Sequence, residues 1–308
     1  MNPDVQSHFY SLLVEDVHTC TKRLEPQAAA LIKRYYAVLE TACESSHGGQ
    51  PASGLTNRAA FARYNWIRRT TPMVDLLSRL PIRERPWKVL DAGCGLGTEA
   101  LFWSSLREDI EVVGVDVAAE RLQAARDRLD YFETHLDKKL KVEFRNQNVF
   151  KLLKDERFDL IWTMEAISHI DPAEDFISLA GKWLPKPGFL IISDSHRLNP
   201  KMLWRIFKLR KQNVTVRVEK EFIEDEVIQY AQERLFSIRE LNTLVQKAGF
   251  DSISSQLSIF FPPAIFTSKR FSRAAAHLDT LLDRIPMVRN FGGIYTLMAR
   301  KGSGVLIE

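Results

Sequence analysis

Three glycines at alternate positions follow a short apolar run that ends in an acid. The stretch "KVLDAGCGLGTEA" (88–100) places Asp91 before Gly93, Gly95 and Gly97, and residues that can start a helix come next. A glycine turn exposes backbone that a ligand can approach closely. Because ligands of open parallel sheets bind beyond the carboxyl ends of the strands, this stretch predicts a binding turn between a strand and a helix.

Two classes of cofactor use such a turn. The run from Gly95 to Ala100 satisfies the G-x-G-x-x-A pattern of dinucleotide sites, which is a weak signal by itself. Asp91 favours S-adenosylmethionine, because a carboxylate repels a pyrophosphate and attracts a cationic amino group. Asp116 ends the apolar run "VVGVDV", and one carboxylate can accept two ribose hydroxyls. Asp116 alone would suit a nicotinamide cofactor equally well.

The order of these motifs resembles that of the class I S-adenosylmethionine-dependent methyltransferases, from about Trp87 to Asp194 and again over 237–301. The resemblance implies that the glycine turn packs against the methionyl part of the cofactor and that Asp116 binds the ribose hydroxyls. Asn148 stands where the family often has an acid for the adenine amino group, and its amide oxygen can still accept that bond. The implied cofactor-binding residues are Asp91, Gly93, Cys94, Gly95, Gly97, Asp116, Val117, Asn148, Val149 and Met164. We interpret Cys94 as a small filler of the turn without a redox role.

Methyl transfer needs alignment of the reacting atoms and, for some acceptors, removal of a proton. Glu165 and His169 in "EAISHI" are four residues apart and share a face if a helix has begun there. His169 is a candidate base, and His196, just past the fifth expected strand, is a second one. The alternative is that Glu165 contacts the cofactor and His169 bonds a backbone carbonyl. No cluster of Asp and His of the kind that binds magnesium is evident, so we expect no metal.

The elements that must position these residues alternate along the chain. Apolar runs typical of buried strands are separated by amphipathic segments typical of helices, which predicts an α/β fold. The resemblance implies a Rossmann-like, seven-stranded, mostly parallel sheet with helices on both faces and an antiparallel last strand. The expected strands are 87–93, 110–117, 141–149, 158–165, 188–195, 252–261 and 293–301.

The rest of the chain predicts a cap and two lids. Residues 1–85 are interpreted as an N-terminal helical cap, in which Tyr64 and Trp66 offer aromatic contacts, and 86–302 as the methyltransferase domain. Helical lid insertions are expected at about 196–235 and 261–292. Residues 200–212 and 259–271 mix apolar and basic side chains, which suit either a lid packed on the sheet or peripheral contact with an anionic membrane.

Composition narrows the partners. The net charge of +4 is mild, and no nucleic-acid-binding signature is present, so no nucleic-acid partner is expected. Three scattered cysteines, Cys20, Cys43 and Cys94, fit a reducing compartment, which predicts a cytoplasmic protein, with peripheral membrane contact left open. The function hypothesis is O-, N- or C-methylation of a small, hydrophobic or amphiphilic metabolite or lipid. The alternatives are methylation of a protein or RNA, and a cofactor-binding protein without catalysis.

Overall fold

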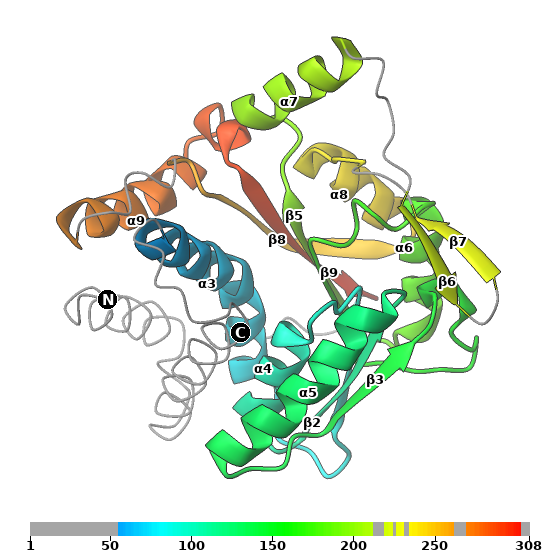
Figure 1. The fold of residues 1–308 in the computed structure, drawn as a ribbon. Helices are drawn as coiled ribbons and strands as arrows, with labels where there is room; N and C mark the ends of the chain where they lie inside the picture. Colours follow the sequence, from blue (N-terminus) through cyan, green and yellow to red (C-terminus); the bar gives the residue numbers. More distant parts are fainter. Residues whose placement is uncertain (1–54, 212–218, 224–225, 231–233, 262–268, 303–308) are drawn as a thin grey trace. The chain divides into compact units, whose positions relative to one another are not determined.

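The computed structural model describes residues 55–211, 219–223, 226–230, 234–261 and 269–302 (Figure 1). By their internal contacts the residues group into two compact units. One unit comprises Met1–Pro81 and Leu257–Ile294, and the other comprises Ile82–Gln256 and Tyr295–Glu308. The predicted boundary between a cap at 1–85 and a domain at 86–302 stays a prediction. None of the described helices is long and apolar enough to cross a membrane.

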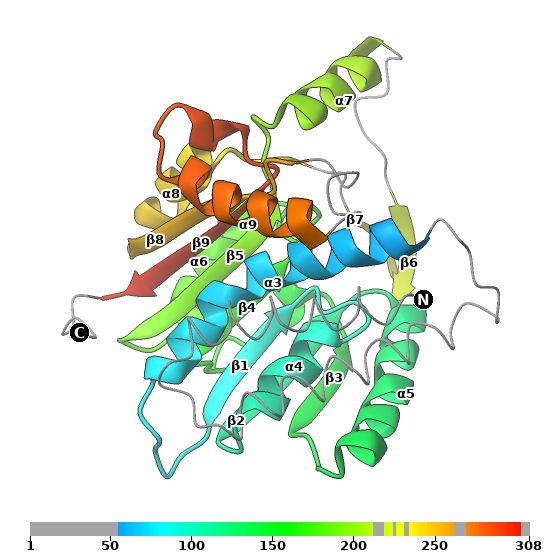
Figure 2. The same ribbon diagram turned by 90° about the vertical axis from the view of Figure 1, so that its left-hand side faces the viewer.

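A seven-stranded sheet in the order β3-β2-β1-β4-β5-β9-β8 organises the second unit (Figure 2). Strand β1 pairs in parallel with β2 and β4, β2 with β3, and β4 with β5. The expected Rossmann-like α/β fold is therefore confirmed. The strands are β1 (Trp87–Ala92), β2 (Ile110–Asp116), β3 (Val142–Asn146), β4 (Leu160–Met164), β5 (Gly188–Ser195), β8 (Phe250–Ser258) and β9 (Ile294–Lys301).

Burial explains why these apolar runs form central strands. Every residue of β1 except Lys88 is buried, and so is every residue of β4 except Met164. Strands covered on both faces consist of such continuous apolar runs. Trp103 of the helix after β1 packs edge-on against Trp162 of β4, with ring centroids 5.1 Å apart. The helices that follow these strands are α4 (Thr98–Leu106), α5 (Ala119–Leu136), the short 3-10 helix η1 (Val149–Lys151) and α6 (Ala173–Trp183).

Helix α8 (Ile238–Lys247) begins and ends at local signals in its sequence. The Ser237 hydroxyl accepts from the Glu240 amide, and the Glu240 carboxylate accepts from the Ser237 amide, which forms a capping box. Gly249 follows the helix with a φ of 83°, the left-handed conformation that commonly ends helices. The residues on either side of the helix thus set both of its ends.

The insertion after β5 differs in part from its prediction. Helix α7 (Pro200–Lys211) forms as expected, but β6 (Glu219–Ile223) and β7 (Glu226–Tyr230) pair as an antiparallel hairpin where a helix was expected. The segments "EKEFI" and "EVIQY" carry the β-branched and aromatic residues that favour strands, with Phe222 opposite Val227. The expectation of a wholly helical insertion at about 196–235 was therefore wrong.

The first unit contains helix α3 (Leu55–Arg79), helix α9 (Lys269–Asp283) and the 3-10 helix η3 (Val288–Phe291). The α9 residue Asp279 is buried and accepts from the amides of Ile259 and Phe260, which follow β8. Helix α3 ends at Arg79, two residues before Pro81. The helices expected before Leu55 and part of the second lid, 262–268, lie outside the described residues.

Candidate functional site

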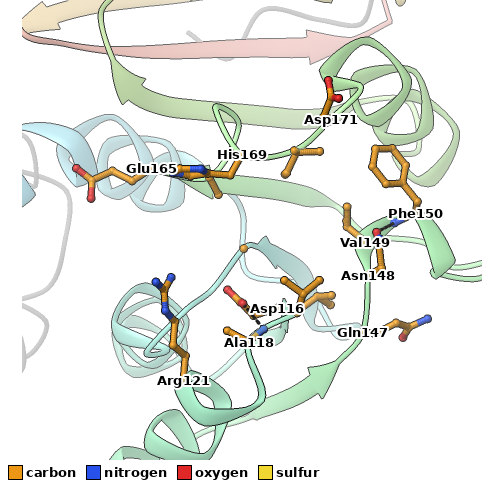
Figure 3. A pocket seen from close by; sticks show the side chains of 15 residues that line it. Asp116, Ala118, Arg121, Gln147, Asn148, Val149, Phe150, Glu165, His169 and Asp171 are labelled. Carbon is orange, nitrogen blue, oxygen red and sulfur yellow. Dashed lines mark hydrogen bonds between the residues drawn. The ribbon is translucent and has the colours of Figure 1, made fainter. Parts of the chain in front are cut away.

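A cavity of about 340 Å³ opens at the carboxyl ends of β1, β2, β3 and β4 (Figure 3). Parallel strands bring these ends to one edge of the sheet, which is where α/β folds bind ligands. All lining residues belong to the unit that contains the sheet. They are Gly93, Val115, Asp116, Val117, Ala118, Arg121, Gln147, Asn148, Val149, Phe150, Glu165, Ala166, His169, Ile170 and Asp171.

The glycine turn after β1 adopts a backbone conformation that other residues resist. Gly93, Gly95 and Gly97 have φ angles of 77°, 50° and 72°. A Cβ atom on Gly93 would lie 2.4 Å from the Cβ of Ala166, whereas one on Gly95 would have nothing within 4 Å. The turn therefore packs closely beneath the end of β4 at Gly93 and leaves open space above Gly95.

Asp116 ties this turn to the helix that follows β2. Its Oδ2 accepts from the Gly95 amide at 2.7 Å, and its Oδ1 accepts from the Ala118 amide at 2.8 Å. The side chain of Asn146 donates to the backbone oxygens of Asp116 and Val117, which fixes the same loop. Each carboxylate oxygen keeps a second acceptor position, so Asp116 can act as a local cap and still bind two hydroxyls.

The carboxyl group of Asp91 is almost fully buried. Burial, followed by the nearby charges of Glu99 and Asp116, raises its pKa well above the ordinary value. Its Oδ2 has no hydrogen-bond partner among the described residues. A buried acceptor without a partner is costly, and a cationic group bound above the turn would relieve that cost.

Cys94 fills space inside the turn. Burial raises the pKa of its thiol well above the ordinary value, so the thiol stays protonated at neutral pH. A Cβ on Gly114 of β2 would lie 3.0 Å from the Cys94 sulfur, which means that the sulfur occupies the place of a missing side chain. These contacts support the interpretation of Cys94 as a filler without a redox role.

Asn148 and Val149 form the wall of the cavity that follows β3. The Asn148 side-chain oxygen accepts from the Phe150 amide at 3.0 Å and so caps η1 (Figure 3). That oxygen retains a second lone pair for an adenine amino group. The predicted strand over 141–149 ends at Asn146, because Asn148 uses its side chain to start this turn instead of extending the ladder.

Glu165 and His169 lie on the other side of the cavity from Asn148 (Figure 3). Glu165 has a φ of 52°, a left-handed conformation that is uncommon for a residue with a side chain. Its amide donates to Ser193 of β5, and the buried Asp194 carboxylate accepts from the Ser168 amide. The neighbouring strand thus holds the turn that carries both side chains, although α6 begins only at Ala173.

The cavity brings together most of the predicted site residues, but not all of them. Gly93, Asp116, Val117, Asn148, Val149, Glu165 and His169 line it, whereas Asp91, Cys94, Gly95, Gly97, Met164 and His196 do not. The His196 ring is fully buried and packs edge-on against Tyr295, with centroids 6.1 Å apart. The roles assigned to these residues from the sequence stay predictions.

Sequence reasoning missed several lining residues. Arg121 lies one turn into α5, five positions after Asp116, and Phe150 directly follows the predicted Asn148-Val149 pair. Asp171 comes two residues after His169 and adds a carboxyl group to the wall. Position in the turn after each strand was the signal that could have identified them. The lining therefore carries three acids, Asp116, Glu165 and Asp171, against one guanidinium.

Comparison with known proteins gives consistent matches. A family model described as "Methyltransferase domain" matches residues 64–255, a range that contains every residue lining the cavity. A phosphoethanolamine N-methyltransferase of Triticum aestivum is 32% identical over 135 residues, which are 44% of this chain and 25% of that protein. A ubiquinone biosynthesis O-methyltransferase of Rhodopseudomonas palustris (strain TIE-1) is 29% identical over 123 residues, 40% of this chain and 43% of that protein.

A third relative is an erythromycin 3''-O-methyltransferase of Saccharopolyspora erythraea. It is 32% identical over 108 residues, which are 35% of this chain and 34% of that protein. The matched segments thus span between a quarter and about two fifths of the length of these curated relatives.

Proposed function

The chain belongs to the family of methyltransferase domains, and from that premise we propose that it transfers a methyl group from S-adenosylmethionine to a small, hydrophobic or amphiphilic acceptor. The observation that carries the proposal is the cavity at the carboxyl edge of the sheet, with Asp116 fastened to the glycine turn. Excess acid in its lining suits a ligand that carries a positive charge.

The residues present fit that cofactor. Asp91 has a buried carboxyl oxygen without a hydrogen-bond partner among the described residues, and this oxygen could bind the amino group of the cofactor. The open space beside Gly95 could hold the methionyl part that carries this amino group. Asp116 has acceptor positions left for the ribose hydroxyls, and Asn148 has one for the adenine amino group. The bound cofactor would supply a methyl group on a sulfonium centre, which is already a strong electrophile.

The chain's own part in the chemistry is to orient the acceptor and to take a proton. The His169 imidazole is a candidate base for a hydroxyl or amine acceptor, and Glu165 is held beside the glycine turn by its bond to β5. The names of the relatives mention phosphoethanolamine, ubiquinone biosynthesis and erythromycin, which are small-molecule contexts. They support a small acceptor here, although they do not fix which one.

The test uses the purified full-length chain. Calorimetry with S-adenosylmethionine and S-adenosylhomocysteine should show binding, and nicotinamide dinucleotides should show none. Incubation of the protein with a radiolabelled methyl donor and either lipid or aqueous metabolite extracts should place label in a small-molecule fraction. Label on protein or RNA would favour the macromolecular alternative, and binding without transfer to any fraction would favour a non-catalytic protein.

His169→Asn is the sharpest variant for the catalytic part. If His169 removes a proton, we expect transfer to fall by about 10²–10⁴-fold. The dissociation constant of S-adenosylmethionine should stay within about twofold, because the residue is not assigned to cofactor binding. Unchanged transfer would assign His169 to a backbone contact instead.

A further inference from the structure

Helix α7, labelled in Figure 1, carries large exposed apolar side chains that the proposed function does not use. The exposed fractions of Leu203, Trp204 and Phe207 are 45%, 59% and 56%. Phe207 follows Trp204 by three residues and Leu203 by four, so the three side chains lie on one side of the helix. Scattered exposed apolar residues are ordinary, but adjoining large ones that include a tryptophan mark an interaction surface.

The same helix is basic along its whole length. Between Pro200 and Lys211 it contains no acidic residue, while its basic residues are Lys201, Arg205, Lys208, Arg210 and Lys211. Lys201 and Lys208 are exposed, and the Lys208 ammonium lies 4.2 Å from the centroid of the Trp204 ring. An aromatic face with ammonium groups at its border is the arrangement that interfacial helices present to anionic lipids.

We propose that the face formed by Leu203, Trp204 and Phe207, called here the α7 face, binds an anionic lipid bilayer surface. The aromatic rings would enter the headgroup region, and the lysine ammonium groups would pair with lipid phosphates. The positive charge of α7 favours an anionic bilayer over a second copy of the chain as the binding partner. A second copy of the chain packed face to face would bring two wholly basic helices together, which costs free energy.

The position of α7 connects the bilayer to the reaction site. Strand β5 ends at Ser195, and the chain reaches Pro200 through a turn in which the Asn199 amide donates to the His196 carbonyl. Because β4 and β5 are parallel, α7 leaves the same edge of the sheet that holds the cavity. An amphiphilic acceptor held in the bilayer would thus be near the cavity. That consequence rests on the proposed function, whereas lipid binding itself does not.

Vesicle sedimentation of the full-length chain tests the α7 face. Vesicles of phosphatidylcholine alone are compared with vesicles that contain about one third phosphatidylglycerol, at low and high salt. We expect binding only to the anionic vesicles and a decline with salt, since exposed charges are screened. Trp204→Glu combined with Phe207→Glu should weaken binding by about tenfold or more, because two anions replace the inserted rings.

A control variant replaces two apolar side chains elsewhere that are at least as exposed, Ile82→Glu with Leu153→Glu, and it should bind vesicles as the unmodified chain does. Trp204→Phe keeps the apolar face, so binding should persist while the vesicle-induced shift in tryptophan emission diminishes. Calorimetry with S-adenosylmethionine on every variant reports cofactor binding separately, so a failure of the proposed function is distinguishable from a failure here.

Three results would overturn the proposal. The first is no binding to anionic vesicles, and the second is equal binding of the control variant and the double variant Trp204→Glu with Phe207→Glu. The third is a dimer of the unmodified chain in light scattering that becomes a monomer in this double variant. The last result would make the α7 face a contact between copies of the chain.

Discussion

Asp116 shows how one side chain can serve the fold and a ligand together. Its two carboxylate oxygens accept from the Gly95 and Ala118 amides, which fixes the glycine turn against the start of α5. The oxygens still have acceptor positions that face the cavity lining. The residue identity was predictable from the apolar run that it ends, whereas the amides that it holds were not, because they depend on how two turns pack.

Asp116→Ala should raise the dissociation constant of S-adenosylmethionine by about a hundredfold or more. Each hydrogen bond to a charged group contributes about 1.5–3 kcal/mol, and two would be lost. Calorimetry measures the change. Glu120→Ala removes an exposed acid from the first turn of α5 that does not line the cavity, so the affinity of this variant should stay unchanged. Equal effects of the two variants would contradict the assigned role.

Asp91→Asn should stabilise the ligand-free protein and weaken cofactor binding. Burial raises the pKa of Asp91, so the folded state binds its proton more tightly than the unfolded state does. The unmodified protein therefore loses stability as pH rises from the ordinary value of 3.8 toward the raised pKa. The stability gain of the variant should grow over that interval and then level off.

Thermal unfolding of Asp91→Asn and the unmodified chain across this pH range measures the difference, and calorimetry should show an affinity loss of about tenfold or more. Asp155→Asn, an exposed acid outside the site, serves as the control and should change neither quantity. A variant that is less stable than the unmodified chain at neutral pH would contradict the account of Asp91.

At the scale of elements, the glycine turn is set by close packing as much as by backbone conformation. Gly93→Ala places a Cβ 2.4 Å from that of Ala166 and also forces a positive φ on alanine. We expect a loss of about 2–5 kcal/mol in the free energy of unfolding, from left-handed strain of about 1–2 kcal/mol and overpacking of about 1–3 kcal/mol. Urea unfolding measures it.

Gly249→Ala is the matched control. Gly249 has a similar φ of 83°, but a Cβ there meets nothing within 4 Å. Only the conformational cost of about 1–2 kcal/mol should appear, with cofactor affinity unchanged. If both variants lost the same stability, crowding against Ala166 would not be what requires glycine at position 93.

Elements were predictable where a local signal agreed with the tertiary environment. The buried strand from Gly188 and the capped helix after Ser237 follow directly from an apolar run and a capping box. The hairpin of β6 and β7 was not, because the sequence of one charged strand does not reveal which segment it pairs with. The same limit applies to Arg121, whose place in the cavity depends on the turn of α5.

The carboxyl ends and the amino ends of the parallel strands carry different groups of side chains. The carboxyl edge carries the cavity, while the amino edge carries Asp159, which precedes β4 and is 3% exposed. Its carboxylate pairs with Arg83 at 2.5 Å and Arg85 at 2.6 Å, and it accepts from the Lys88 amide at 2.9 Å. The Arg83 guanidinium also stacks on Trp87, 3.5 Å from the ring centroid. This cluster ties the segment before β1 to the sheet.

Asp159→Asn should therefore lower stability without affecting the cofactor. Breaking a buried ion pair costs about 3–5 kcal/mol, and since the Arg85 side chain is 62% exposed we expect about 2–3 kcal/mol. Urea unfolding measures the loss, while the affinity for S-adenosylmethionine should remain within about twofold. Asp116→Ala should weaken the affinity far more than any fall in stability accounts for. A large affinity loss in Asp159→Asn would mean that the two edges of the sheet are coupled, because the amino edge would then control the shape of the cavity.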